Sequence, residues 1–235
     1  MSMLADIEPV NRESTASIIA RRLRDAIETG ALPPGSQLGE SDLAARFEVS
    51  RGPLREAMQR LLSEGLLRSE PHRGLFVIDL EPDDVYDVYW ARSAIERAAA
   101  IRVLRSGHRQ QVADTLADAV RAMAEADAQD DPTALSESDL AFHEALIEAS
   151  GSRRLVRMAR TLLIETRMCL SALQDTYTRE HPGTDERIAE HNRLIEALRS
   201  GDEDRMLTLL QAHMDDAVDR LAPTADRPRE RDTRT

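Results

Sequence analysis

The stretch from Leu38 to Arg68 constrains the fold more than any other, because its pattern indicates two short helices joined by a tight turn. We expect Ser41 to cap the first helix and Ser50, at the end of the turn, to cap the second. Pro53 falls in the first turn of the second helix, where its missing N–H costs little. Apolar residues recur at helical spacing on one side of that helix, which therefore faces a core: Leu54, Met58, Leu61 and Leu62. Two short helices in this order form a helix-turn-helix.

The second helix also carries a polar ridge, in which Arg51, Arg55 and Gln59 follow one another at intervals of four residues. A helix fits the major groove of B-DNA, and one guanidinium group can hydrogen-bond both O6 and N7 of guanine. Ser50 and the backbone N–H groups at the start of the helix suit phosphates. The alternative is a solvent-exposed arginine face on an ordinary pair of helices. The pattern favours DNA binding, with the second helix as the recognition helix.

A β-hairpin is predicted directly after the second helix. Gly65 is expected to end that helix, and short strands follow at residues 66–68 and 75–78, with a turn at residues 69–74. The tip of the hairpin is basic, because it contains His72 and Arg73 beside Gly74. A hairpin in this place is a wing whose tip is positioned to reach the minor groove beside the recognition helix.

These segments resemble the winged helix-turn-helix of the GntR family of bacterial transcription regulators. The matching stretches cover nearly all of residues 14–78: GALPPGSQL (Gly30 to Leu38), VSRGPLREAM (Val49 to Met58), EGLL (Glu64 to Leu67) and RGLFV (Arg73 to Val77). The resemblance implies that Arg51 and Arg55 contact DNA. It also implies that four further residues lie close to the DNA: Gly52, Pro53, Arg73 and Gly74.

The charge of the chain is distributed unevenly. The formal net charge is −12, but residues 1–80 carry 10 arginines against 12 acidic residues, whereas residues 81–235 carry 21 against 31. The acidic excess therefore lies away from the predicted recognition helix, where it weakens nonspecific adhesion to DNA. Because the sequence has no long basic tract, we expect affinity to depend on a few placed arginines and on dimerisation.

The location of the protein is predicted from what the sequence lacks. The first ten residues do not form a signal peptide, and no stretch of 18 apolar residues is long enough to span a membrane. The single cysteine, Cys169, cannot form an internal disulfide, and a small core residue is favoured over a redox switch. We therefore expect a cytoplasmic protein that does not bind membranes.

The predicted fold class is mainly α, with an N-terminal winged helix-turn-helix that has a small β-hairpin wing and a C-terminal all-helical antiparallel bundle. We expect a flexible arm at residues 1–13, a DNA-binding domain at 14–79, an effector-binding and dimerisation domain at 83–221, and a disordered tail at 222–235. The polar, proline-containing stretch near residue 80 is the best candidate for the boundary between the DNA-binding domain and the helical domain. Six helices are predicted after it, at residues 83–105, 108–128, 133–149, 153–174, 184–199 and 203–221.

Four polar side chains share the apolar faces of three of these helices. Asp139 and His143 are one turn apart on one helix, and His191 and His213 fall on the apolar faces of two others. A single buried histidine is usually a hydrogen-bonded core residue. Burying three imidazoles and a carboxylate without a common partner is costly, however. This donor set suits a divalent ion, with zinc or nickel preferred.

Arg92 lies on the apolar side of the first bundle helix, with Glu96 one turn further on. One interpretation is a buried Arg92–Glu96 pair. The other is a guanidinium group aimed into a cavity, where it binds the carboxylate of a small organic acid effector.

This half of the chain resembles the effector domain of the FadR subgroup of the GntR family, the FCD domain. The matching stretches cover most of residues 83–221: ARSAIERAAA (Ala91 to Ala100), DLAFHEALIEASG (Asp139 to Gly151), EHNRLIEALRSGD (Glu190 to Asp202) and AHMDDA (Ala212 to Ala217). In metal-binding members, an aspartate and three histidines hold the ion beside the effector. The resemblance implies the same role for the residues that match: Asp139, His143, His191 and His213.

We therefore predict a ligand-responsive transcription regulator that binds a palindromic operator as a homodimer, because two-fold protein symmetry mirrors two-fold DNA sites. The family leads us to expect a repressor. Two alternatives stay open. One is a metal-dependent hydrolase fused to a DNA-binding module, although no separate general base or nucleophile stands out. The other is a direct metal sensor, in which the ion itself is the signal.

Overall fold

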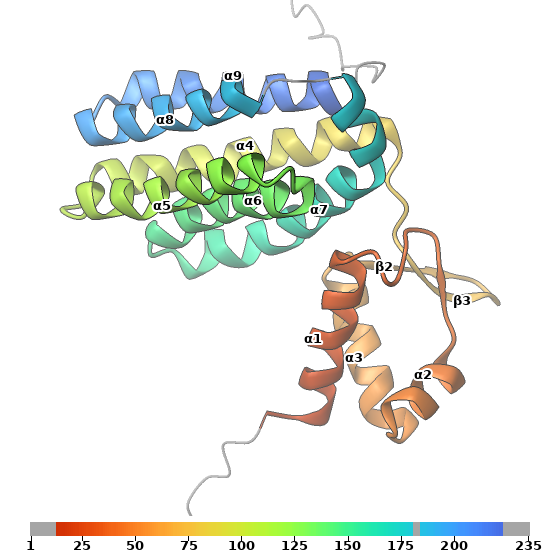
Figure 1. The fold of residues 1–235 in the computed structure, drawn as a ribbon. Helices are drawn as coiled ribbons and strands as arrows, with labels where there is room; N and C mark the ends of the chain where they lie inside the picture. Colours follow the sequence, from red (N-terminus) through yellow and green to blue (C-terminus); the bar gives the residue numbers. More distant parts are fainter. Residues whose placement is uncertain (1–12, 181–183, 223–235) are drawn as a thin grey trace, which may run out of the picture. The chain divides into compact units, whose positions relative to one another are not determined.

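The chain folds into two units, residues 1–78 and 79–235 (Figure 1). The structure is a computed structural model that describes residues 13–180 and 184–222. Most of the predicted arm and tail, and the turn predicted at residues 181–183, lie outside these ranges. Within them, no helix is both long enough and apolar enough to cross a membrane.

The first unit contains three helices and a small sheet. Its elements are α1 (Thr15–Glu28), β1 (Gln37–Leu38), α2 (Glu40–Phe47), α3 (Arg51–Ser63), β2 (Leu67–Glu70) and β3 (Gly74–Val77). Helix α1 packs against α3 through fully buried aliphatic side chains, which include Leu23, Ile27, Leu54 and Leu61. The helix-turn-helix and the wing are therefore held on one apolar core.

The sheet shows two differences from the predicted hairpin. Its strand order is β1-β3-β2, all antiparallel, so a short strand that the sequence pattern did not predict adds to the edge of the wing. The predicted turn at residues 69–74 is also too long. Because Glu70 pairs with Gly74, only three residues remain in the loop, and His72 takes a left-handed conformation (φ 64°) to close it.

The prediction that Ser41 caps the first helix of the helix-turn-helix is wrong. Helix α2 begins at Glu40, and its N-cap is Gly39. The reason is that β1 ends at Leu38, so the chain must turn into the helix at once. The Ser41 hydroxyl accepts a hydrogen bond from Arg51 instead, at 3.3 Å.

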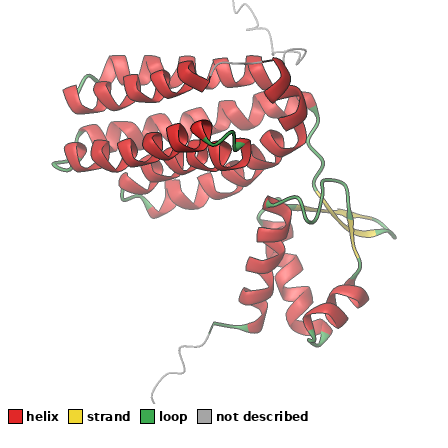
Figure 2. Cartoon of the chain, in the orientation of Figure 1, coloured by secondary structure: helices red, strands yellow, loops and turns green. Residues whose placement is uncertain are grey.

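The second unit is a bundle of helices, and the predicted mainly-α fold class is confirmed (Figure 2). The elements are α4 (Pro82–Leu104), α5 (Arg109–Ala128), α6 (Pro132–Ala149), α7 (Arg153–Glu180), α8 (Thr184–Ser200) and α9 (Glu203–Leu221). Helix α7 extends beyond its predicted end at residue 174, because no proline or glycine interrupts the sequence before Pro182.

Helix α4 occupies the middle of this bundle and packs against α6, α7 and α9 (Figure 1). Helices α5, α6 and α8 enclose the largest apolar cluster, in which Leu116, Phe142 and Leu194 are completely buried. The side-chain oxygens of Asp131 and Asp202 cap α6 and α9. This packing fixes the inward faces of α4, α6, α8 and α9, which carry the polar residues described below.

Leu116→Ala should lower the free energy of unfolding by about 2–5 kcal/mol, because it opens a cavity in the completely buried cluster. Urea unfolding followed by circular dichroism measures the change. Thr115→Ala is the matched control, since Thr115 is exposed on the same turn of α5 and its loss should change stability little. Equal effects of the two substitutions would contradict this account of the core.

Candidate functional site

The four predicted metal ligands lie together inside the second unit. Asp139 and His143 come from α6, His191 from α8 and His213 from α9. One potential ligand atom of each residue lies within 4.8 Å of those of the other three. All three imidazoles are buried. We refer to these four residues as the His/Asp cluster.

Each imidazole is held from outside the cluster through its Nδ1 atom. In His143, Nδ1 lies 2.6 Å from Oε2 of Glu96, and in His213 it lies 3.0 Å from Oε2 of Glu190. In His191, Nδ1 lies 2.8 Å from the carbonyl oxygen of Arg187. Since carboxylates and carbonyls only accept, each Nδ1 donates and each Nε2 is left as a lone-pair acceptor. Such outer partners are typical of metal-binding histidines.

The Nε2 atoms converge on one another. Those of His143 and His213 are 3.2 Å apart, and that of His191 lies 3.5 Å from Oδ1 of Asp139. The Nε2 atom of His191 is buried and has no hydrogen-bond partner among the described residues. Burying several acceptors around one point without a donor is unfavourable. A divalent cation at that point would satisfy all of them, so the donor set fits a metal ion.

The protonation states also suit an ion. Burial lowers the pKa of His191 to about 3, and burial likewise lowers the pKa of His143. Both imidazoles are therefore neutral near pH 7, which is the form that binds metals. Burial alone would raise the pKa of Asp139, but the nearby histidines and Arg187 outweigh burial and lower it. Two of the imidazoles and the carboxylate are thus in the forms that bind a divalent ion.

Arg92 forms the ion pair of the first interpretation and lines a pocket as the second requires, while its binding of an effector carboxylate stays a prediction. It is buried, and its Nε donates to Oε1 of Glu96 at 2.6 Å, which gives the predicted ion pair. Its guanidinium also lies over the ring of Tyr89 and lines a pocket beside the His/Asp cluster. Burial opposes the ionisation of Glu96, but His143 and Arg92 outweigh it and lower the pKa of Glu96 to about 2. A continuous chain of contacts therefore joins the pocket wall to His143.

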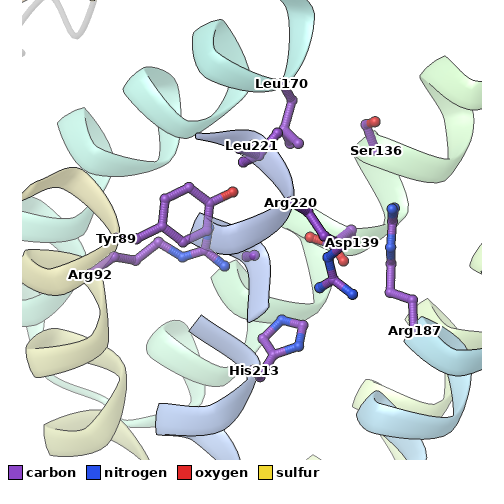
Figure 3. A pocket seen from close by; sticks show the side chains of 10 residues that line it. Tyr89, Arg92, Ser136, Asp139, Leu170, Arg187, His213, Arg220 and Leu221 are labelled. Carbon is purple, nitrogen blue, oxygen red and sulfur yellow. The ribbon is translucent and has the colours of Figure 1, made fainter. Parts of the chain in front are cut away.

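The pocket is narrow and rich in cations (Figure 3). Its free volume is about 20 Å³, enough for one ordered water molecule. Its lining consists of Tyr89, Arg92, Ser136, Asp139, Leu170, Arg187, His213, Ala217, Arg220 and Leu221. Burial raises the pKa of Tyr89, so its hydroxyl stays protonated and can donate.

Two arginines of this pocket were not predicted from the sequence. Arg187 comes from α8 and Arg220 from α9. Helical spacing from the predicted ligands is the signal that identifies them. Arg187 is one turn before His191, and Arg220 is two turns after His213, so both share a face with a ligand.

In the first unit, the predicted DNA-contacting residues lie on exposed surfaces. Arg51 and Arg55 are exposed on α3, and Gly52 and Pro53 lie in its first turn. Ser50 is the N-cap of α3, as predicted, but its side chain makes no capping hydrogen bond.

Ion pairs hold several of the exposed arginines of the first unit. Arg55 forms an exposed ion pair with Glu40 at 2.7 Å. In the wing, Arg68 and Arg73 both pair with Glu70 and lie over the ring of Phe76. Gly74 follows with φ 99°, which favours glycine. The recognition helix and the wing thus both present guanidinium groups to solvent.

Comparison with known proteins identifies both units. Residues 15–77 match the family described as bacterial regulatory proteins, gntR family, and residues 87–216 match the FCD domain. An uncharacterized HTH-type transcriptional regulator of Agrobacterium vitis is 34% identical over 142 residues, which are 60% of this chain and 83% of that protein. The gluconate operon transcriptional repressor of Bacillus licheniformis is 29% identical over 209 residues, which are 88% of this chain and 85% of that protein.

Among solved structures, a GntR-type transcriptional regulator from Rhodococcus sp. RHA1 is similar, with a TM-score of 0.73 and 27% identity. The match covers 90% of this chain and 99% of that one. These relatives are transcription regulators, so the prediction that the protein is not an enzyme is confirmed, and the hydrolase alternative is not supported. The chain belongs to the GntR family of bacterial transcription regulators, and its FCD domain agrees with the FadR subgroup.

Proposed function

We propose that this regulator is a repressor whose FCD domain binds one divalent ion, zinc or nickel, and a small organic acid beside it. The convergence of the three Nε2 atoms, each oriented by an outer partner on Nδ1, carries the proposal. Asp139, His143, His191 and His213 would hold the ion. When bound, the ion would offer an open coordination position to an oxygen of the acid.

The organic acid is proposed to bind in the cation-rich pocket next to Arg92. The gluconate operon repressor, which spans most of this chain, is named for an organic acid, and this supports an effector of that kind. Binding would release the operator by favouring one arrangement of the two DNA-binding units in a dimer. Such a shift requires the acid to bind one arrangement more tightly than the other. As a DNA-binding regulator, the protein would act in the cytoplasm, where bacterial DNA lies.

Operator recognition is assigned to α3, assisted by the wing. The DNA is a duplex that the wild-type protein selects from a randomised pool. Arg51→Ala should raise the dissociation constant for this duplex by roughly 10- to 100-fold, because it removes a direct base contact. Gel-shift titration measures the dissociation constant. Arg121→Ala, which removes an exposed arginine from α5, is the control and should leave binding unchanged. An unaltered dissociation constant for Arg51→Ala would refute the assignment of α3 as the recognition helix.

The metal proposal is tested with His191. We expect His191→Ala to reduce the metal content of the purified protein well below one ion per chain, because the three remaining side chains cannot replace the lost Nε2 ligand. Elemental analysis gives the content. His108→Ala is the matched control, since His108 is exposed at the start of α5 and outside the His/Asp cluster. If operator affinity follows metal concentration with no organic acid present, the ion itself is the signal.

Dimerisation is proposed to use the outer face of α4 and α7, which pack against each other. Trp90 on α4 is 62% exposed and Met158 on α7 is 58% exposed, and they are the large hydrophobic side chains that the described part of the chain leaves in solvent. Exposed apolar side chains on neighbouring helices favour a protein interface.

The charges along this helix pair are self-complementary. Cys169 of α7 packs in one cluster with Val85 and Tyr89, near the start of α4, and the sequence around this end carries Asp84, Asp87 and Glu165. Ala159 packs near the middle of α4, so the two helices run antiparallel. The opposite end of the pair is basic, because it carries four exposed arginines: Arg153, Arg154, Arg157 and Arg160. A two-fold axis across the pair would bring the basic end of one copy to the acidic end of the other.

Trp90→Glu should therefore shift the protein toward monomers at micromolar concentration, as measured by sedimentation velocity. Trp90→Phe keeps an aromatic side chain and is expected to preserve the dimer. Circular dichroism checks that both variants fold. A wild-type sedimentation coefficient for Trp90→Glu would show that this face is not the interface.

A further inference from the structure

We propose that the effector is a dicarboxylic acid, and that Arg220 is the residue that distinguishes it from monocarboxylic acids. The inference rests on the proposed function of the pocket and deepens it, because it names the charge of the ligand. In this assignment, one carboxylate binds to Arg92 and to an ion held by the His/Asp cluster. The second carboxylate binds to Arg220.

The lining of the pocket favours more than one negative charge. Guanidinium groups enter it from three different helices: Arg92 from α4, Arg187 from α8 and Arg220 from α9 (Figure 3). Its lining includes one carboxylate, that of Asp139, which belongs to the His/Asp cluster. This concentration of cations lies in a half of the chain whose net charge is −10, with 21 arginines against 31 acidic residues. Guanidinium groups bind carboxylates through paired, charge-assisted hydrogen bonds.

Arg92 and Arg220 differ in how well the protein already satisfies them. Arg92 is bound to Glu96 at 2.6 Å, and both side chains are buried. Arg220 lies 3.7 Å from Oε1 of Glu190, which is beyond hydrogen-bonding distance. The Nε of Arg220 is buried without a hydrogen-bond partner among the described residues. A buried donor of this kind is costly until an acceptor reaches it.

Glu190 is engaged elsewhere, because its Oε2 accepts from Nδ1 of His213 at 3.0 Å. It therefore supports a residue of the His/Asp cluster and can give Arg220 only a weak interaction. A monocarboxylic acid bound near the cluster would leave Arg220 in the same unsatisfied state. A dicarboxylic acid would bring a second carboxylate to Arg220.

The pocket must widen to admit such a ligand, since its free volume is about 20 Å³. The Arg220 side chain is suited to move, because 18% of it is exposed and it is long and flexible. Its rotation onto a ligand carboxylate would replace the weak contact with Glu190. Glu190 would then keep its contact with His213 but lose the one with Arg220. Binding of the second carboxylate would therefore alter the electrostatic environment of His213 in the His/Asp cluster.

The test compares acids of equal chain length on metal-loaded protein. Isothermal titration calorimetry with succinate against butyrate, and with malate against 3-hydroxybutyrate, should show the dicarboxylate binding at least about tenfold more tightly in one or both pairs. Arg220→Gln should remove most of this preference while butyrate affinity changes little. Arg220→Lys, which keeps the charge but loses the guanidinium fork, should retain part of it. Arg121→Gln removes an exposed arginine outside the pocket and should behave like the wild type.

Metal content and circular dichroism are measured for every sample, so that ligand binding is compared at equal occupancy and equal folding. A protein that holds no ion would refute the proposed metal centre. A metal-loaded protein that binds both members of each pair equally would refute the dicarboxylate inference alone. The dicarboxylate inference would also be refuted if no dicarboxylate from malonate to adipate bound. It would likewise be refuted if Arg220→Gln lowered the affinity for both acids of a pair equally.

Discussion

The effector domain depends on the orientation of three buried imidazoles. Each Nδ1 donates to an oxygen outside the His/Asp cluster, so each Nε2 must face its centre. The packing of α4, α6, α8 and α9 makes this possible, because the acceptors come from neighbouring helices or from the preceding turn. An apolar core alone would leave these nitrogens unsatisfied, and the bundle would lose stability by burying them. A shared partner at the centre, such as the proposed ion, would satisfy these nitrogens together.

Two carboxylates connect that centre to the ligand pocket. Glu96 bridges Arg92 and His143, and Glu190 lies between Arg220 and His213. Each carboxylate therefore touches a pocket arginine on one side and a member of the His/Asp cluster on the other. A ligand that draws either arginine away changes the hydrogen bonding of a histidine. Metal and acid are thus expected to bind cooperatively, since each alters the environment of the other.

Periodicity was sufficient to predict the helices of the bundle and the inward direction of Asp139, His143, His191 and His213, because both depend on the spacing of residues within one helix. Glu96 and Glu190 were not assigned as outer partners of His143 and His213, because these contacts join different helices and leave no trace in local spacing. The sequence pattern did not predict strand β1 for a similar reason. Its two residues gain their extended conformation only by pairing with β3. Ser41 was misassigned because the cap depends on where that strand ends.

Ion pairs within the DNA-binding unit favour the proposed dimer. Two of its exposed arginines, Arg55 and Arg73, are paired with Glu40 and Glu70, so binding to DNA must replace these contacts. Exposed ion pairs are weak, and the exchange is feasible, but the gain at each guanidinium is smaller than for an unpaired one. With 10 arginines against 12 acidic residues in residues 1–80, one unit cannot compensate through general attraction to the phosphates. The proposed dimer would supply affinity through two units that bind together, and a ligand that altered their arrangement would then control the binding of DNA.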